Sequence, residues 1–515
     1  MVLGLIIVGG GLLRCGFVRH PIRSDEAGTY VRYASPGWAH AASAYDKPNN
    51  HILHTIAVRA VTLTFGDAEW AIRLPTLIAG ILTIPAAYWV ARQEYGPRVG
   101  LITAALVAAS SPLVEFSVTA RGYTLLGLLF LVGLGVGRRM IRGERRRWAF
   151  AFVATWAAAF YTIPIALYGF VTAVVWLAAD GWRLPGERRR RALRLLGIGA
   201  AGAVLVAALL YVPAARRDGV DAIVANRFVQ PVGLDETLRR NPRMLRRVWG
   251  RWNRDVPSPA RVAALALFCV AVACHRRIAT SAVPLPVVAI VVCASITLAQ
   301  RVVPFPRVWL WGLPIYHMAI AAGLAAVTRW AMVGWRSRWR RRRLGRADLV
   351  GPRWWTAARE LLAGAVAVAL LIWLGNNVWR TQSVLASDEA APFREAGPAA
   401  EFLAGRLERR DLVISAGRAN MPLQYYLARL GHRYQLWRPG SARLHWRSRL
   451  YAVIDARTDS LESVIRAHGL DAALFGKPRL LWQEESARVY ELRRRPAPTT
   501  ATRAAEVVVP TTAPR

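Results

Sequence analysis

Apolar residues in this chain fall in long blocks separated by short polar segments, not in the fine alternation of a soluble core. With their flanks, runs such as 100–113 and 195–212 approach the ~20 residues that a helix needs to cross ~30 Å of hydrocarbon. The pattern therefore predicts a polytopic, all-α membrane protein. Eleven spans are expected, at about residues 1–19, 70–92, 99–116, 122–137, 148–164, 165–180, 195–213, 259–275, 282–299, 308–329 and 359–378.

Three other parts of the chain lack this character. Residues 20–69 are too long for a turn and too mixed for a span, which predicts interfacial helices in a first outer loop. Residues 380–495 have short apolar runs at 411–415 and 450–455 and a helical stretch at 461–468, as expected of a small α/β domain outside the membrane. Residues 496–515, rich in Pro, Thr and Ala, predict a disordered tail, so the membrane domain is expected to be 1–379.

The formal net charge is +38, and the arginines are concentrated between the apolar blocks. A nucleic-acid surface would not be interrupted by segments that prefer lipid, so we expect no nucleic-acid partner. The positive-inside rule instead predicts a cytoplasmic N-terminus, an extracytoplasmic C-terminal domain and a location in a bacterial cytoplasmic membrane. The basic loop 214–259, predicted outside, fits this rule poorly. The cytoplasmic clusters are expected at 138–147, 183–194, 276–277 and 336–343.

Asp25 and Glu26 directly follow the first span, where membrane meets water. A carboxylate at that depth can take a proton from a nucleophile or bind a metal, and partial burial tunes its pKa. The alternative is that two acidic residues simply end a helix in solvent. The loop continues with Lys47, one of only two lysines in the chain, and Asn50, which enrich it in hydrogen-bonding groups.

His51 and His54 are three residues apart and are able to share one helix face. Such a pair binds a divalent metal when a carboxylate joins it, but two histidines alone are more often interfacial hydrogen-bonding groups. A divalent metal therefore stays possible, and no metal ligand is assigned.

Ionisable residues also stand at the predicted outer ends of later spans. Glu115 and Arg121 are costly near the bilayer unless they are paired or bind a ligand, so they predict either an ion pair or an arginine facing a phosphate. Arg307, among prolines and aromatics, is typical of an anchoring residue in an aromatic belt.

Together these segments resemble the GT-C membrane glycosyltransferases, in the branch of protein O-mannosyltransferases and aminoarabinose (lipid A) transferases. The resemblance covers about the first 130 residues and is carried by short motifs in a fixed order. They are Asp25-Glu26, the stretch from Lys47 to His51, Arg73 to Pro75, Glu115 to Ser117 with Ala120 to Tyr123, and the segment around Arg307.

The resemblance implies a polyprenyl-phosphate sugar as donor and a protein, lipid or glycan as acceptor. It implies that Asp25 is the general base with Glu26 beside it, and that Arg121 and Arg307 stabilise the departing phosphate. Lys47, Asn50, His51, His54, Arg73, Glu115 and Tyr123 would line the same cavity. Those transferases typically read Lys-Pro-Pro where this chain has Lys47-Pro-Asn, which leaves the acceptor class open.

Two functions of different classes follow from the pattern. The first is glycosyl transfer at the outer face of the membrane. The second is a non-enzymatic translocase or transporter of lipid-linked sugars, which also needs many spans and a basic cavity. Transporters more often place ionisable groups near the bilayer midplane in repeated, broken helices, whereas here the densest polar set lies at the outer boundary.

Overall fold

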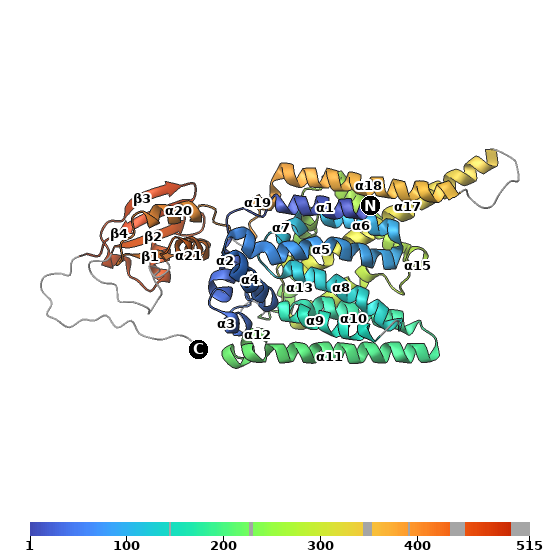
Figure 1. Cartoon of the computed structure of the whole chain (residues 1–515), viewed down its shortest axis with the longest axis horizontal. Helices are drawn as coiled ribbons and strands as arrows, with labels where there is room; N and C mark the ends of the chain where they lie inside the picture. The colour runs from blue at the N-terminus through green and yellow to red at the C-terminus, as the bar shows by residue number, and fades with distance from the viewer. Residues whose placement is uncertain (144–145, 226–229, 343–352, 390–391, 433–448, 496–515) are drawn as a thin grey trace. The chain divides into compact units, whose positions relative to one another are not determined.

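The structure is a computed structural model, and it describes residues 1–143, 146–225, 230–342, 353–389, 392–432 and 449–495 (Figure 1). Contacts divide the chain into two units. The first unit comprises Met1–His20 and Tyr33–Ser387, and the second comprises Pro21–Arg32 and the chain from Asp388 onward. The predicted boundary at 379/380 therefore differs from the division by contacts, because helix α18 continues to Thr381 and the segment 21–32 packs with the C-terminal part.

The first unit is a bundle of long helices, and each predicted span contains one. Five helices are long and apolar enough to cross a membrane, or six if α6 and α7, bent by 62°, count as one span. The helical membrane architecture is thus confirmed for the described residues, while the number eleven stays a prediction. The helices are α1 (Val2–Cys15), α5 (Glu69–Tyr95), α6 (Pro97–Ala108), α7 (Ser111–Ser117), α8 (Tyr123–Ile141), α9 (Arg147–Thr162), α10 (Ala166–Trp182), α11 (Gly186–Asp218), α14 (Ser258–Ala273), α16 (Leu285–Gln300), α17 (Leu313–Arg342) and α18 (Arg353–Thr381).

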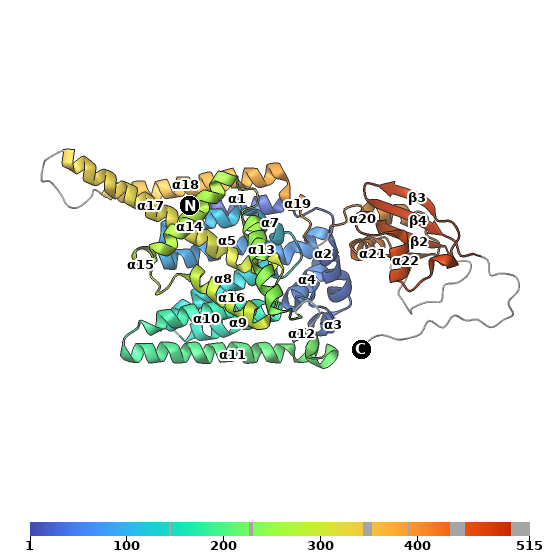
Figure 2. The ribbon, with the colours of Figure 1, turned by 180° about the vertical axis from the view of Figure 1, so that it is seen from behind.

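Helix α8 packs at the centre of this bundle, against α5, α9 and α10 (Figures 1 and 2). Glycines let its neighbours approach: a Cβ on Gly133 would lie 2.7 Å from the ring of Trp156, and one on Gly135 would overlap the ring of Trp89. Small residues commonly permit such close packing between helices in lipid, where no hydrophobic force drives association.

Shorter helices connect the spans. The first loop holds α2 (Ser24–Gly28), the π-helix η1 (Thr29–Ala34), α3 (Trp38–Ser43) and α4 (Ile52–Phe65). At the end of α4 the side chains of Leu63 and Phe65 are exposed, as expected of a helix in the membrane interface. Later connections contain α12 (Asp221–Val224), α13 (Leu234–Trp252), α15 (His275–Ile278), the 3-10 helix η2 (Pro306–Gly312) and α19 (Ser383–Ala386).

The second unit contains a four-stranded sheet of order β1-β2-β4-β3. The predicted strands and helix are found as β1 (Leu412–Ser415), β2 (Leu450–Asp455) and α22 (Leu461–Ala467). β1 pairs in parallel with β2, and β4 (Ala487–Leu492) pairs antiparallel with both β2 and β3 (Arg479–Glu484). The hairpin of β3 and β4 was not identified in the sequence. The predicted tail 496–515 lies outside the described residues.

Helices cover both faces of the sheet, which explains why every residue of β2 is buried. Tyr451 and Val453 face the core formed with α20 (Ala396–Ala404) and α21 (Asn420–Arg429). Their neighbours Ala452 and Ile454 face the core on the side of α22. Alternate side chains of a strand point to opposite faces, so a strand buried on both faces reads as a continuous apolar run.

Candidate functional site

A buried polar cluster forms where the turn between α7 and α8 meets the start of α4. His51 precedes the first residue of α4, and its Nδ1 accepts a hydrogen bond of 2.7 Å from the backbone N–H of Gly122. Glycine is needed there, because a Cβ at position 122 would lie 2.9 Å from the Cβ of His51 and 2.7 Å from Thr162. The close approach fixes the imidazole against the turn that carries Arg121.

The hydrogen bond to Nδ1 also fixes the proton of His51. Burial, aided by the charge of Arg121, lowers the pKa of His51 well below its usual value, so the ring is neutral. A neutral imidazole that accepts at Nδ1 carries its proton on Nε2. Nη2 of Arg121 lies 3.4 Å from that Nε2. Both groups are then donors, so neither satisfies the other.

Arg121 has another buried N–H donor that needs a hydrogen-bond acceptor. Its Nη1 donates to the carbonyl of Asn49 at 2.9 Å, whereas its buried Nε has no hydrogen-bond partner among the described residues. Among the described residues, Nε of Arg121 thus has no partner, and Nη2 of Arg121 and Nε2 of His51 face only each other, so these three N–H groups have no acceptor there. An anionic oxygen, such as one of a phosphate, satisfies this donor set.

Tyr123 and Arg307 complete the cluster. Nε of Arg307, in η2, donates to the hydroxyl of Tyr123 at 3.1 Å, although the two residues are 184 positions apart. The ring of Tyr123 packs edge-on against His51, with 5.0 Å between centroids, and the guanidinium of Arg121 lies 5.8 Å from its centroid. Four of the residues predicted from sequence are therefore brought together.

Three other predicted residues of the first loop have different surroundings. The amide of Asn50 donates to the carbonyls of Ala41 and Ala44 and accepts from the hydroxyl of Thr55 at 2.6 Å, so it holds the loop in shape. His54 is fully buried on α4, and Lys47 is exposed.

Arg73 and Glu115 lie in separate polar contacts. Buried Arg73 donates to the carbonyls of Val18 and His20, where the chain leaves α1. Buried Glu115 forms ion pairs with Arg254 at 2.8 Å and Arg251 at 3.6 Å. These two arginines were not predicted, because nothing in the sequence of loop 214–259 indicates that it packs against α7. The one available signal was that this loop has more arginines than the positive-inside rule predicts for an outer loop.

Asp25 and Glu26 belong to helix α2, which is part of the second unit and packs there against α21. Glu26 is buried, and its carboxylate accepts from the backbone N–H of Arg23 at 3.0 Å, as an acidic residue in the first turn of a helix commonly does. Asp25 is half-buried. Their catalytic roles stay a prediction, as does the use of a metal. Within the described ranges, no group of three or more His, Cys, Asp or Glu side chains gathers to hold a metal ion.

Comparison with known proteins gives a family match for part of the chain and a shared fold for most of it. Residues 46–212 match the family described as dolichyl-phosphate-mannose-protein mannosyltransferase. Comparison with curated proteins gives no match. Among solved structures, ArnT from Cupriavidus metallidurans matches with a TM-score of 0.61 and 14% identity in the apo state, over 95% of this chain and 97% of that chain.

The same ArnT bound to undecaprenyl phosphate matches with a TM-score of 0.60 and 15% identity, over 95% of this chain and 97% of that chain. The archaeal oligosaccharyltransferase AglB from Archaeoglobus fulgidus, in complex with an inhibitory peptide and a dolichol-phosphate, matches with a TM-score of 0.51 and 12% identity. That match covers 89% of this chain and 70% of AglB. Residues 46–212 of this chain are thus similar to the dolichyl-phosphate-mannose-protein mannosyltransferase family, and the chain shares its fold with the membrane proteins ArnT and AglB.

Proposed function

We propose that this protein transfers a glycosyl group from a polyprenyl-phosphate sugar to an acceptor hydroxyl at the outer face of a bacterial cytoplasmic membrane. The observation that carries the proposal is the set of three N–H donors of His51 and Arg121 that have no acceptor among the described residues, supported by the hydrogen bond from Arg307 to Tyr123. The relative ArnT was solved bound to undecaprenyl phosphate, a ligand whose phosphate has the oxygens that such donors bind.

The chemistry follows from this assignment. The acceptor oxygen attacks the anomeric carbon and forms the new glycosidic bond, while the bond from that carbon to the phosphate oxygen breaks. The electron pair leaves with the lipid phosphate, where Arg121 and Arg307 stabilise the developing charge. The hydroxyl proton passes to the carboxylate of Asp25, acting as general base, and the transfer inverts the anomeric centre. Glu26, Lys47, Asn50, His54, Arg73 and Glu115 act as supporting residues.

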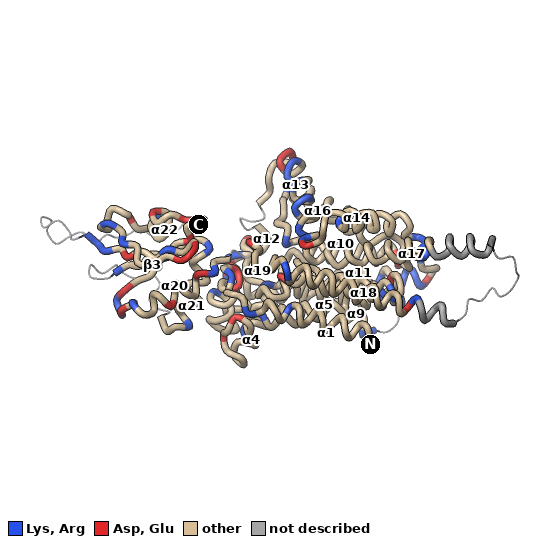
Figure 3. Tube along the Cα trace, turned by 90° about the horizontal axis from the view of Figure 1, so that it is seen from above, with Lys and Arg blue, Asp and Glu red and all other residues tan. Residues whose placement is uncertain are grey.

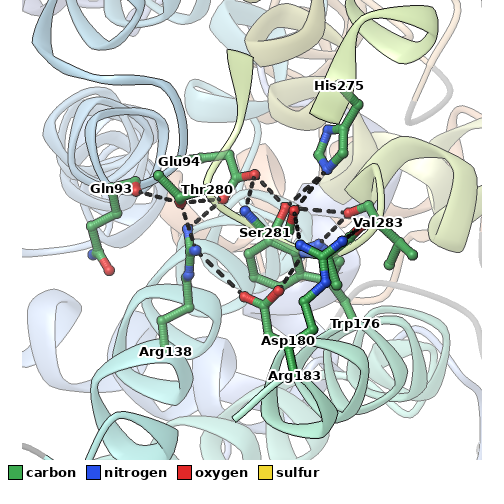
Figure 4. Close-up of polar contacts among 11 residues, drawn as sticks. Gln93, Glu94, Arg138, Trp176, Asp180, Arg183, His275, Thr280, Ser281 and Val283 are labelled. Atoms are coloured by element: carbon green, nitrogen blue, oxygen red, sulfur yellow. Dashed lines mark hydrogen bonds and ion pairs between the residues drawn. The ribbon is translucent and has the colours of Figure 1, made fainter. Parts of the chain in front are cut away.

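The translocase is the competing function, and a second polar network weighs against it. At the other ends of α5, α8 and α10, the carboxylate of Glu94 pairs with Arg138, which also lies 3.4 Å from Asp180 (Figure 4). Ser281, between α15 and α16, donates its backbone N–H to Glu94 at 3.2 Å, and Ala282 donates to Asp180 at 2.6 Å. Opening a path at this end would break a buried charge pair, so the network favours a site with access from one side only.

The test is sugar release from a panel of radiolabelled polyprenyl-phosphate sugars by the purified full-length protein, with and without EDTA. We expect one donor to be consumed by the wild-type protein and not by Asp25→Asn. Asp388→Asn, an 88% exposed carboxylate of the same unit, is the matched control and should keep full activity.

Full transfer by Asp25→Asn would remove the proposed base. Failure of the folded wild-type protein to consume any donor, together with movement of a donor across reconstituted vesicles, would establish the translocase instead. Loss of transfer in EDTA would assign a divalent metal to the reaction.

A further inference from the structure

Helix α13 lies in the loop whose arginines conflict with the positive-inside rule. It packs against α7, which carries Glu115, and against η2, which carries Arg307. It therefore stands at the end of the bundle where α8 begins with Tyr123, opposite the end where α8 carries Arg138. The arginines of α13 are thus separated from the polar network of Glu94, Arg138 and Asp180 by about the length of α8.

The direction of α13 differs from that of the spans. Figures 2 and 3 show it lying across the direction of long helices such as α11 and α18. A helix at the end of a transmembrane bundle and transverse to it lies along the membrane surface. One face is anchored to the bundle by Met244, whose sulfur accepts from Trp309 Nε1 at 3.2 Å, and by buried Val248.

Beside the anchored face, α13 exposes a stripe of leucines. Leu234, Leu238 and Leu245 are 49%, 53% and 61% exposed, and their spacing of four and seven places them on one side of the helix. Arg239, Arg243 and Arg246, also exposed, share another side about a third of a turn away. On a helix that lies in a membrane surface, an apolar stripe packs against the acyl chains and a cationic stripe contacts the lipid phosphates.

The charge of α13 selects among lipids. Its 19 residues contain six arginines and two acidic residues, Asp235 and Glu236, the latter paired with Arg240. Arginine stripes of this kind bind anionic headgroups, and a zwitterionic surface offers them no net attraction. We propose that α13 is an interfacial helix that inserts its leucine stripe into the leaflet on the side of the candidate site and binds anionic phospholipid headgroups through Arg239, Arg243 and Arg246.

The proposal also accounts for the conflict in the loop 214–259. Arginines that are bound to headgroups of the leaflet they face need not mark the cytoplasmic side, and long loops escape the rule more readily than short ones. Binding of lipid by α13 depends on the position, exposure and charge of this helix and not on catalytic activity.

The test places a bimane fluorophore on Leu245→Cys in a full-length background without the four native cysteines (Cys15→Ala, Cys269→Ala, Cys274→Ala, Cys293→Ala). The protein is reconstituted in nanodiscs of phosphatidylcholine with or without phosphatidylglycerol, and quenching by a lipid labelled with nitroxide near the headgroup is measured. We expect at least twofold stronger quenching with phosphatidylglycerol, and loss of this gain in Arg239→Gln/Arg243→Gln/Arg246→Gln and in high salt.

Two variants separate local from general charge effects. The triple change to Lys keeps the charge and should keep the gain. Arg188→Gln/Arg191→Gln/Arg194→Gln removes the same charge from exposed positions of α11 at the other end of the bundle, and should leave quenching at position 245 unchanged. The proposal would be overturned if quenching were the same with and without phosphatidylglycerol and the same in the wild type and the α13 variants. An unquenched probe combined with salt-sensitive binding of soluble heparin would also overturn it, and would assign the arginines to a soluble anionic glycan.

Discussion

The donor geometry of Arg121 distinguishes a phosphate site from a simple positive charge. Its guanidinium is held by the Asn49 carbonyl and leaves Nε and Nη2 for a ligand. Arg121→Lys keeps the charge but loses the planar fork of donors. We expect the affinity for undecaprenyl phosphate to fall by roughly tenfold or more, measured by equilibrium binding to the detergent-solubilised protein.

The control for this substitution is Arg216→Lys on α11, an exposed arginine outside the cluster, which should bind as the wild type does. Unchanged affinity in Arg121→Lys would show that only the charge at position 121 matters, and the assignment of a bidentate phosphate contact would be wrong.

His51 makes stability depend on pH in a defined direction. Its pKa in the folded protein is lowered by burial and by Arg121, so between that value and about 6.5 only the unfolded chain takes up a proton there. Stability contributed by the neutral ring is therefore present above about pH 6.5 and is lost as the pH falls below it. His51→Gln should reduce the fall in apparent Tm between pH 7.5 and 5.5.

The same replacement at His468, half-buried in the second unit, serves as the control and should leave the fall in place. An identical pH dependence in wild type and His51→Gln would mean that His51 is not held neutral in the folded state.

Among the elements, the break between α6 and α7 depends on a residue of α1. Arg14 is fully buried, and its Nη1 and Nη2 donate to the carbonyls of Ala108 and Val107 at 2.7 and 3.3 Å. Its Nε donates to the hydroxyl of Ser117 at 3.1 Å. The last carbonyls of a helix have no partner within it, and inside an apolar bundle water does not replace one. Arg14 therefore stabilises a bend that α6 and α7 do not stabilise alone.

Arg14→Met should lower the free energy of unfolding by about 1–3 kcal/mol, because buried carbonyls are left without donors. The measurement is the apparent Tm in detergent. Arg19→Met, an exposed arginine just beyond α1, is the matched control and should change stability by less than about 0.5 kcal/mol. Equal effects of the two changes would contradict this role of Arg14.

Across the whole molecule, the two ends of the first unit have opposite chemistry. The end near His51 has N–H donors that are able to bind an anion. At the other end Glu94 and Arg138 are both buried and form an ion pair with each other. Glu94→Gln leaves the charge of Arg138 with less compensation and should cost about 3–5 kcal/mol. Glu360→Gln, which breaks the exposed pair with Arg98, should cost about 0.2–1 kcal/mol in the same unfolding experiment.

A loss at Glu94 no larger than that at Glu360 would show that the network at this end is not a closed structural element. Nothing at this end would then restrict access to the opposite side, whereas the donor set of His51 and Arg121 would be unaffected.

Much of the fold follows from local pattern. The apolar blocks located the helices of the first unit, and short apolar runs located β1 and β2, because burial in lipid or between two helical layers needs continuous apolar sequence. β3 is an edge strand with no buried residue, and its short apolar run 480–482 lies between charged and polar residues, so the hairpin with β4 was missed. Residues 21–32, which the sequence placed in the first outer loop of the membrane domain, pack in the second unit instead.

The sequence by itself determined that this chain is a membrane protein, because composition is a local signal. It also made His51, Arg121 and Arg307 candidates from their residue types and positions beside apolar blocks, and the family resemblance added Tyr123. Only the tertiary structure decided that these four meet, that Glu115 pairs with Arg251 and Arg254, and that His51 carries its proton on Nε2. Such contacts join residues that are up to 184 positions apart, and they depend on how helices pack, which no local pattern encodes.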